Sequence, residues 1–467
     1  MSNANQGGTS RREFLKTTGK VAVASAVVAG AVPRVHAAEN NTINVALIGC
    51  GGRGTGAAAN AVSVNQGPVK LVAMADVFED RLKSSFDNLI KNHADKMDVP
   101  EDRKFVGFDG YQKAMDCLKP GDVAIFATPL AFRWVHFDYA IKKGLHVFME
   151  KPITADGPTS RRMLELAKKA DDKNLKVGVG LMSRHSRHLE QLHARIQDGQ
   201  LGDISGMRAY RMVGPLGSAF SEKWPGDATE LQWQIRRFHS FLWAGGGAFS
   251  DFCIHVIDHC CWMKNAWPVK AQGLGGRHYK NNPDGVAYVD QNFDSYAVEY
   301  TFEDGCTFWV ENRNMIGAAS FYSSYLHGTK GSAIASKHGD CGPPCSIYKG
   351  QRPEKSEMVW ESEVAPEEGN PYQNEWNDLV DAIRNDKPFN EAERGVMASA
   401  VTSLGRKAAH TAQEITLEDM LNSPEEYAPD VAKFTMDSPA PVQADAEGKY
   451  PMPMPGLLKK TEYPGLI

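Results

Sequence analysis

Two groups of ionisable side chains have the types and spacing that proton transfer requires. Lys151 directly follows a short apolar run, and Asp251 and His255 stand four residues apart in a distant segment. An ammonium group can polarise or protonate a substrate oxygen, and a carboxylate can hold in place an imidazole that removes a proton from a hydroxyl group. Lys151, Asp251 and His255 are therefore the predicted catalytic residues.

The spacing in the second group continues to His259. On a helix, Asp251, His255 and His259 share one face, because each is four positions from the next. Two histidines at this spacing are also a common zinc arrangement. A third donor of suitable geometry is missing, however, so we predict no metal. His259 keeps two interpretations, a substrate-binding residue or a buried structural histidine.

A glycine-rich turn lies upstream of both groups. Segment 43–48 has the apolar pattern of a strand and runs into a glycine turn followed by a helical pattern. Three spaced glycines permit a tight turn, close approach of a pyrophosphate and close helix packing, and the helix N-terminus directs its N–H groups at the phosphates. The turn therefore predicts a dinucleotide site. The predicted cofactor contacts in it are Gly49, Gly51, Gly52, Arg53 and Gly54.

The next predicted strand ends in a carboxylate. Asp76 follows strand 70–75, about 20 residues past the last glycine, where a ribose-binding residue is expected. A carboxylate accepts hydrogen bonds from both ribose hydroxyls and repels a 2′-phosphate. Asp76 is therefore a further predicted cofactor contact, and it favours NAD over NADP.

The elements that must position these residues alternate between short apolar runs and amphipathic helical patterns. Such alternation predicts a parallel sheet covered by helices on both faces, a doubly wound Rossmann fold. Lys151 then lies just beyond the carboxyl end of a strand, where open α/β sheets bind their ligands. Strands are expected at 43–48, 70–75, 123–127, 146–149 and 176–180, and helices at 54–63, 79–92, 111–118, 132–143 and 159–169.

After residue 180, strand patterns follow one another without helices between them. Residues 303–305, Glu-Asp-Gly, are a hairpin signal. We therefore predict a C-terminal α+β domain with a large, mainly antiparallel open sheet. Its strands are expected at 206–213, 269–275, 295–302 and 306–312, and helices at 371–384 and 392–412 are expected to pack back against the body.

The first residues are typical of an export signal. Residues 10–16 match the twin-arginine pattern, and an apolar stretch at 21–32 and a small-residue cleavage site ending at Ala37 follow. That stretch is about half of the roughly 20 residues needed to span a bilayer. We expect the twin-arginine machinery to export the chain, and the mature protein to be periplasmic or secreted without membrane insertion. The predicted domains are the signal peptide at 1–37, the Rossmann domain at 38–165, the substrate-binding α+β domain at 166–422 and an extended tail at 423–467.

The composition is that of an ordinary soluble globular protein, with 42% hydrophobic and 23% charged residues. A formal net charge of −5 and the absence of a basic block give nucleic acid no electrostatic footprint. Eight cysteines are too sparse for a disulfide scaffold, although Cys341 and Cys345 could form a bridge in an oxidising compartment.

Several short motifs, taken in their order and spacing, resemble one family. Residues 147–152 read Val-Phe-Met-Glu-Lys-Pro, Thr128-Pro129 and His136 stand upstream, and residues 328–331 read Gly-Thr-Lys-Gly. Over residues 43–410 the chain resembles the glucose-fructose oxidoreductase/inositol dehydrogenase (Gfo/Idh/MocA) family.

The resemblance implies roles for individual residues. Lys151 would contact the substrate hydroxyl and the nicotinamide ribose, and Asp251 and His255 match the Asp-x-x-x-His pair of the family. Relatives also imply a homodimer or homotetramer formed through the open sheet. The resemblance extends the predicted cofactor contacts to Thr128, Pro129, His136, Glu150 and Lys151.

Polar and aromatic side chains near the predicted cleft suit a sugar. Arg184 and His185 follow the strand that ends at residue 180, and Arg237 and His239 precede a run of three glycines. Arginine donates to hydroxyl groups, and nearby tryptophans could stack on the apolar face of a sugar. The same Trp and Arg residues could instead pack the domain junction. The predicted substrate-binding residues are Arg184, His185, Arg237, His239 and His259.

Together these features predict an exported NAD-dependent oxidoreductase that acts on a sugar or polyol hydroxyl and transfers hydride to a tightly bound nicotinamide. Tight binding is expected because no free NAD pool exists outside the cytoplasm. One alternative is an NAD-dependent non-hydrolytic glycosidase or epimerase that uses transient oxidation. A second is a catalytically inactive sugar-binding protein, because fold alone does not establish function.

Overall fold

The computed structural model describes residues 41–339 and 344–466. The predicted signal peptide and Cys341 lie outside these residues, so the bridge between Cys341 and Cys345 stays a prediction. Cys345 is buried, and its Sγ donates to the carbonyl oxygen of Ala335 (3.2 Å). Over the two described ranges, no helix is both long enough and apolar enough to cross a membrane.

The first sheet has six parallel strands in the order β3-β2-β1-β4-β5-β6. The strand order reverses at β1, which lies between β2 and β4, so a crevice forms at the carboxyl ends of these strands. This arrangement confirms the predicted Rossmann fold. The strands are β1 (Ile43–Ile48), β2 (Val69–Asp76), β3 (Lys104–Val106), β4 (Val123–Phe126), β5 (His146–Met149) and β6 (Val177–Val179).

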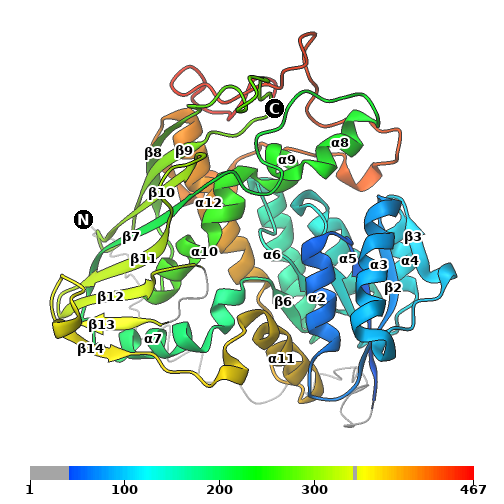
Figure 1. The fold of residues 1–467 in the computed structure, drawn as a ribbon, viewed down its shortest axis with the longest axis horizontal. Helices are drawn as coiled ribbons and strands as arrows, with labels where there is room; N and C mark the ends of the chain where they lie inside the picture. Colours follow the sequence, from blue (N-terminus) through cyan, green and yellow to red (C-terminus); the bar gives the residue numbers. More distant parts are fainter. Residues whose placement is uncertain (1–40, 340–343, 467) are drawn as a thin grey trace, which may run out of the picture. The chain divides into compact units, whose positions relative to one another are not determined.

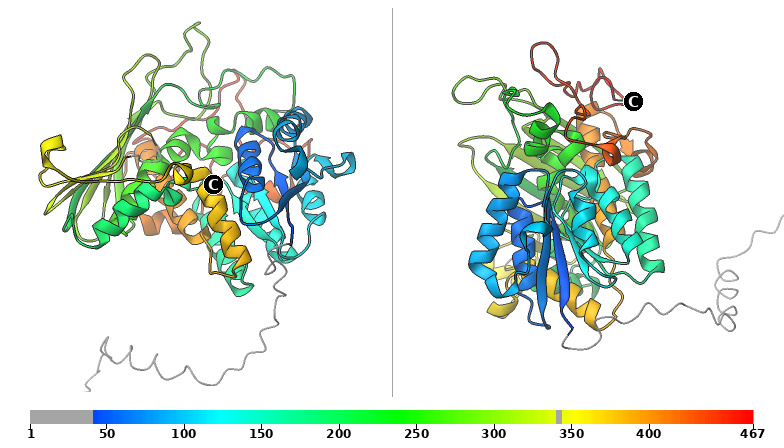
Figure 2. Two further views of the ribbon diagram at one scale, coloured as in Figure 1. Left: turned by 60° about the horizontal axis from the view of Figure 1, so that its bottom comes forward. Right: turned by 90° about the vertical axis from the view of Figure 1, so that its right-hand side faces the viewer.

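Helices cover both faces of this sheet (Figure 1 and the right-hand view of Figure 2). The apolar sides of α4, α5 and α6 pack on one face, and those of α2, α3 and α11 pack on the other. The predicted domain boundary at residue 165 lies inside α6, and β6 still belongs to the sheet after it. The helices are α2 (Gly52–Val62), α3 (Glu79–His93), α4 (Gly110–Asp116), α5 (Arg133–Lys143), α6 (Gly157–Asp172) and α11 (Pro371–Arg384).

The second sheet has nine strands in the order β14-β13-β12-β11-β7-β10-β9-β8-β15. Every neighbouring pair is antiparallel except β7 and β10, which confirms the predicted mainly antiparallel sheet. The predicted hairpin joins β9 to β10, with Gly305 at φ +83°. The strands are β7 (Ile204–Val213), β8 (Lys270–Gly276), β9 (Ser295–Thr301), β10 (Thr307–Asn314), β11 (Phe321–Gly328), β12 (Gly331–Ser336), β13 (Ser346–Tyr348), β14 (Met358–Glu361) and β15 (Ile415–Thr416).

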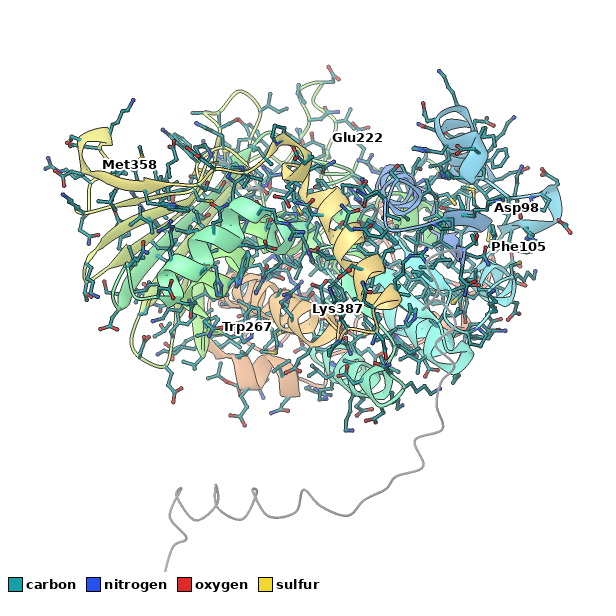
Figure 3. The ribbon with its side chains drawn as sticks, turned by 90° about the horizontal axis from the view of Figure 1, so that it is seen from below. Asp98, Phe105, Glu222, Trp267, Met358 and Lys387 are labelled. Carbon is teal, nitrogen blue, oxygen red and sulfur yellow. The ribbon has the colours of Figure 1, made fainter. Side chains whose placement is uncertain are left out.

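Helices α10 and α12 lie between the two sheets (Figure 1). In α10, Phe249 and Cys253 pack into the core of the second sheet, whereas Ile254 packs into the core of the first domain. Figure 3 shows Met358, at the start of β14, and Phe105, in β3, on opposite sides of these helices. The remaining helices are α7 (Arg187–Gln197), α8 (Glu230–Arg236), α9 (Leu242–Gly245), α10 (Gly247–Lys264), α12 (Ala392–Thr411) and α13 (Leu417–Asn422).

The tail after α13 packs on its own chain. Gln234 in α8 donates to the carbonyl oxygen of Val442 (2.5 Å), and the hydroxyl of Tyr450 donates to Glu230 (2.7 Å). Further along, Glu462 is completely buried. Residues 423–466 therefore cover α8 and α9 at the top of Figure 1 and return to the interior of the protein.

Candidate active site

A cavity of about 830 Å³ opens at the carboxyl ends of the first sheet. Its walls come from both domains: the loops after β1, β2, β4 and β5 on one side, and the segment from α8 to α10 on the other. This is the position at which open α/β sheets bind their ligands. The predicted site residues that line it are Gly49, Gly51, Gly52, Arg53, Gly54, Asp76, Thr128, Pro129, His136, Glu150, Lys151, His239, Asp251 and His255.

The glycine-rich turn has the geometry of a phosphate cradle. Gly49 has a φ of +96°, and a Cβ added there would stand 2.6 Å from the backbone of Ala127. A Cβ on Gly54 would stand 2.0 Å from the carbonyl oxygen of Gly49, so both positions require glycine. At Gly51 and Gly52, by contrast, a Cβ would meet nothing within 4 Å. The turn is therefore tightly packed on the protein side and open where a ligand would approach.

Asp76 joins this turn to the end of β2. Its carboxylate accepts hydrogen bonds from the backbone N–H groups of Cys50 (2.6 Å) and Phe78 (2.9 Å). Burial raises the pKa of Asp76, and the two N–H donors oppose that increase. Arg81 also lines the cavity near this carboxylate. Asp76 thus holds the turn in place and borders the cavity where a ribose is expected.

A buried arginine connects the ends of β4 and β5. Arg133 donates to the carbonyl oxygens of Glu150 (3.1 Å) and Thr128 (2.7 Å) and to the Thr128 hydroxyl (3.1 Å). His136 lies one turn along α5, with Nδ1 3.4 Å from the same hydroxyl. Burial, with the nearby charge of Arg133, lowers the pKa of His136 to about 3, so its imidazole is neutral. Arg133 was not among the predicted contacts, although a charged residue four positions after Pro129, at the start of the next helical pattern, was a usable signal.

Glu150 holds Arg53 over the cavity. Nε of Arg53 lies 2.7 Å from Oε1 of Glu150, and its guanidinium stacks 4.5 Å from the ring centre of Tyr372. The Glu150 carboxylate packs against Gly180, where a Cβ would stand 2.5 Å from Oε2. The two predicted contacts therefore act as a pair, and α11 supplies an aromatic partner that the sequence analysis did not identify.

Lys151 and Asp251 meet across the domain boundary. Nζ of Lys151 donates to the backbone carbonyl oxygen of Asp251 (2.9 Å) and to Oδ1 (3.2 Å). On the other side, Nε2 of His239 lies 3.3 Å from Oδ2 of Asp251. Burial would raise the pKa of Asp251, but the Lys151 ammonium and His239 outweigh it and hold this pKa well below its usual range. Asp251 is therefore an ionised carboxylate between two donors.

The proton on His239 is placed by its other contact. The backbone N–H of Ser218 donates to Nδ1 of His239 (3.1 Å), and this nitrogen must therefore be the unprotonated one. The proton of a neutral imidazole then lies on Nε2, where it points to Asp251. His239 is thus an orienting partner of Asp251 in the cavity wall.

Helix α10 brings Asp251 and His255 to the cavity but leaves His259 outside it. Both Asp251 and His255 line the cavity and are 8% exposed. His259, one turn further, is completely buried, and its Nδ1 lies 3.1 Å from the hydroxyl of Ser324 in β11. The structure therefore places His259 in the core of the second domain. In the portion of the chain that is described, no group of three or more His, Cys, Asp or Glu residues could hold a metal ion.

Three other predicted substrate contacts do not line the cavity. Arg184 forms a two-pronged ion pair with Asp258 (2.8 and 2.7 Å). His185 lies 2.7 Å from Asp378 and 3.1 Å from Glu391. Burial alone would lower the pKa of His185, but the two carboxylates raise it to about 10.

The third residue is Arg237, whose Nε donates to the hydroxyl of Ser221 (2.7 Å). Arg184 and His185 follow β6, at the edge of the sheet and away from the reversal of strand order at β1. Their charges are used in ion pairs within the fold, and the structure does not bring them to the cavity.

Two sequence models match the chain. Residues 43–181 match the one described as "Oxidoreductase family, NAD-binding Rossmann fold", and residues 189–334 match the one described as "GFO/IDH/MocA C-terminal domain". Both match where the structure has the corresponding domain.

Three named relatives are similar to parts of the chain. Levoglucosan dehydrogenase of Pseudarthrobacter phenanthrenivorans is 27% identical over 234 residues, which are 45% of this chain and 54% of the relative. Rhizopine catabolism protein MocA of Rhizobium meliloti is 24% identical over 44% of this chain and 61% of its own length. Inositol 2-dehydrogenase of Corynebacterium glutamicum is 27% identical over 22% of this chain and 29% of its own length. The chain thus matches little more than half the length of the first of these relatives.

Solved structures share the fold over most of the chain. A levoglucosan dehydrogenase in complex with NADH and levoglucosan has a TM-score of 0.60 and 18% identity, and the match covers 81% of this chain and all of that one. An aldose-aldose oxidoreductase from Caulobacter crescentus has a TM-score of 0.60 and 15% identity, and the match covers 80% of this chain and all of that one. The two sequence models cover more than half of the chain, and it therefore belongs to the Gfo/Idh/MocA oxidoreductase family.

Proposed function

We propose that the chain is an NAD-dependent dehydrogenase that oxidises a CH–OH group of a sugar or polyol. The observation that carries this proposal is the contact between Lys151 and Asp251 in the same cavity as the glycine-rich turn. One cavity thus combines a dinucleotide cradle with an ammonium–carboxylate pair suited to a hydroxyl substrate. The relatives named as levoglucosan and inositol dehydrogenases support the same class of substrate.

The residues present fit a dinucleotide. Gly51 and Gly52 leave open space, and the first turn of α2 borders the cavity, so this region would hold a pyrophosphate. Asp76 would accept hydrogen bonds from the ribose. A bound nicotinamide supplies the hydride acceptor. We place NAD above NADP because the carboxylate of Asp76 repels a 2′-phosphate.

Three histidines line the cavity within the described residues, and two of them are poorly suited to accept a proton. His136 has its pKa lowered to about 3, mainly by burial. His239 receives the Ser218 N–H on one nitrogen and directs its own proton at Asp251 from the other. We therefore assign proton uptake from the substrate hydroxyl to His255. The Lys151 ammonium, held by Asp251, donates to the substrate oxygen and stabilises negative charge on it.

We further propose that the protein works outside the cytoplasmic membrane with a retained cofactor. The twin-arginine pattern of residues 10–16 supports export. Phe434 of the tail supports retention, because its ring centre lies 6.2 Å from those of Phe108 and Phe132, which line the cavity. A retained cofactor must return to its starting state in each turnover. The reaction would then pair two sugars, or use transient oxidation for glycoside cleavage or epimerisation.

We also propose a homodimer or homotetramer through the open face of the second sheet. Leu274, Trp309 and Phe321 in its strands are 69%, 46% and 53% exposed, and the strand register places all three on the same face of the sheet. Sedimentation of wild type and of a Trp309→Glu/Phe321→Glu variant tests this assembly. We expect the variant to sediment as a smaller species.

The function is tested by denaturing purified mature protein and analysing the nucleotide that it releases. Near-stoichiometric NAD supports the proposal, whereas NADP contradicts the role assigned to Asp76. Protein that contains no nucleotide and takes none up would instead be a sugar-binding protein without catalysis.

Hydride transfer is then tested by mixing the protein separately with levoglucosan, myo-inositol and glucose and following the NADH absorbance of the bound cofactor in a single turnover. Lys151→Ala should abolish cofactor reduction. The control is Lys143→Ala, which removes an ammonium that pairs with Asp116 (2.9 Å) at the surface. Equal activity in Lys151→Ala and wild type would refute the assignment.

A further inference from the structure

A completely buried arginine of α12 joins three separate segments of the chain. Arg406 donates through Nη1 to the carbonyl oxygen of Gly246 (2.8 Å) and to the hydroxyl of Ser250 (3.0 Å). Through Nη2 it donates to the carbonyl oxygen of Ala155 (2.9 Å). Its Nε and Nη2 bind the carboxylate of Glu462 in the tail (2.9 and 3.0 Å). The planar guanidinium, with its donors at fixed angles, thus sets the spacing of these groups.

Two of the three segments carry the proposed catalytic pair. Ala155 lies four residues after Lys151, in the loop that leaves β5. Gly246 immediately precedes α10, and Ser250 immediately precedes Asp251. The same helix α12 holds the Lys151 loop a second time, because the N–H of Ile153 donates to the hydroxyl of Ser399 (3.0 Å). Arg406 therefore connects the two chain segments whose side chains meet in the cavity.

The third segment, the tail, supplies the charge that allows this arginine to be buried. Glu462 is also completely buried, and besides Arg406 it contacts Nδ1 of His410 (2.8 Å) and the hydroxyl of Tyr427. A charge in the interior is tolerated only when it is paired and hydrogen-bonded. Without Glu462, Arg406 would lose the partner that compensates its charge.

We propose that Arg406 and Glu462 are positioning residues for the reaction, and that through them the C-terminal tail fixes the distance between Lys151 and Asp251. This inference rests on the proposed dehydrogenase function for its catalytic consequence. The guanidinium holds the Lys151 loop and the first turn of α10 in register, and the tail carboxylate holds the guanidinium. Neither residue lines the cavity, so each acts through Lys151 and Asp251.

The test uses the full-length mature protein with Arg406→Met/Glu462→Met. Replacing both members of a buried pair with apolar residues of similar volume often leaves a protein folded, because no unpaired charge remains. The variant loses the bonds to Gly246 and Ala155. A misplacement of about 1 Å at a reacting pair costs on the order of 10²-fold in rate, so we expect kcat to fall by about that factor while bound NAD and KM change little.

A matched control exists in the same tail. Arg162 of α6 pairs with Glu426 (2.9 Å), and this pair ties the tail to the first domain near the surface through hydrogen bonds between the two side chains, not to the backbone of the Lys151 loop or α10. Arg162→Met/Glu426→Met should keep kcat close to that of wild type. Arg406→Lys keeps the positive charge but loses the planar set of guanidinium donors. Its kcat should therefore lie between that of wild type and that of Arg406→Met/Glu462→Met.

Hydrogen exchange provides a readout that does not depend on turnover. We expect faster exchange at residues 152–156 and 246–251 in the Arg406/Glu462 variant and unchanged exchange there in the control. A folded variant with wild-type kcat and wild-type exchange in both segments would overturn the inference, and so would an equal loss of kcat in both double variants. If none of the tested sugars reduces the cofactor of the wild-type protein, the proposed function fails. The exchange comparison then still decides whether Arg406 and Glu462 hold the two segments in place.

Discussion

Replacing Asp251 with asparagine tests the catalytic arrangement with the smallest change of shape. Asp251 presents one carboxylate oxygen to Lys151 (3.2 Å) and the other to Nε2 of His239 (3.3 Å). Both partners are donors, whereas asparagine has one acceptor oxygen and one NH₂ group. One donor must therefore face another donor. His239 could reverse its proton only by losing the hydrogen bond that it accepts from the Ser218 N–H.

The magnitude follows from distance and burial. Unit charges 3.2 Å apart attract by about 5 kcal/mol at an effective dielectric constant of 20. The side chains of Lys151 and Asp251 are only 15% and 11% exposed, so screening by water is weak. Removing one partner of a buried pair costs about 3–5 kcal/mol, and we expect Asp251→Asn to lower the unfolding free energy by roughly 3 kcal/mol. We expect kcat to fall by about 10² to 10³-fold, as when one electrostatic group of an active site is lost.

Asp258→Asn is the matched control on the same helix. Asp258 pairs with Arg184 (2.7 Å) and is also buried, but it lies outside the cavity. Denaturant unfolding should show comparable destabilisation of both variants, whereas NAD reduction at saturating sugar should fall only in Asp251→Asn. If Asp251→Asn keeps the kcat of Asp258→Asn, the Lys151–Asp251 pair contributes only to stability and our assignment of the catalytic pair is wrong.

Three further predictions concern stability and the cofactor. The folded pKa of His185 is raised from 6.5 to about 10, so its bound proton stabilises the protein fully below pH 6.5. Between pH 6.5 and about 10 this stabilisation decreases by roughly 1.4 kcal/mol per pH unit. The difference in unfolding free energy between wild type and His185→Gln should therefore shrink over that range, and a constant difference would show that His185 is not charged in the folded protein. Gly54→Ala should reduce NAD binding and lower Tm, because the added Cβ would stand 2.0 Å from the carbonyl oxygen of Gly49. Gly52→Ala, whose Cβ would meet nothing within 4 Å, should leave Tm unchanged, and a calorimetric scan of both variants checks this. Asp76→Ser should lower the ratio of NAD affinity to NADP affinity, because the carboxylate that repels a 2′-phosphate is removed. Titration of the variant with each nucleotide measures this ratio, and an unchanged value would mean that another residue sets the preference.

The first domain was predictable because its determinants are local. The apolar run of β1, the glycine turn and the start of α2 follow one another in the sequence, and each of these begins within a few residues of its expected position. The short edge strand β3 was not predicted, because three residues are too few to show a strand pattern. In the second domain, β7 to β10 were found from their strand patterns. Strands β11 to β15 were missed. Strand β12, for example, reads Gly-Ser-Ala-Ile-Ala-Ser and is buried along its whole length, so its small residues show no alternation.

The site residues divide in the same way. Lys151, Asp251 and His255 lie in short motifs, and the structure places all three at the cavity. Arg184 and His185 have the right residue types for a sugar site, but their carboxylate partners come from α10, α11 and the residue before α12. Pairing between distant segments is set by the tertiary fold, and no local spacing reveals it.

The return of the chain in α11 has a consequence for synthesis on the ribosome. A nascent chain that has reached residue 181 contains all six strands of the first sheet but not α11, whose Trp376 and Leu379 pack against Phe148 and Gly178. About 190 residues separate these parts, which is roughly 10–40 s of translation at typical rates. During that time the apolar side of β5 is uncovered and available to chaperones. The nucleotide-binding half is therefore completed after most of the second half has been made, and nucleotide loading is expected to follow translation.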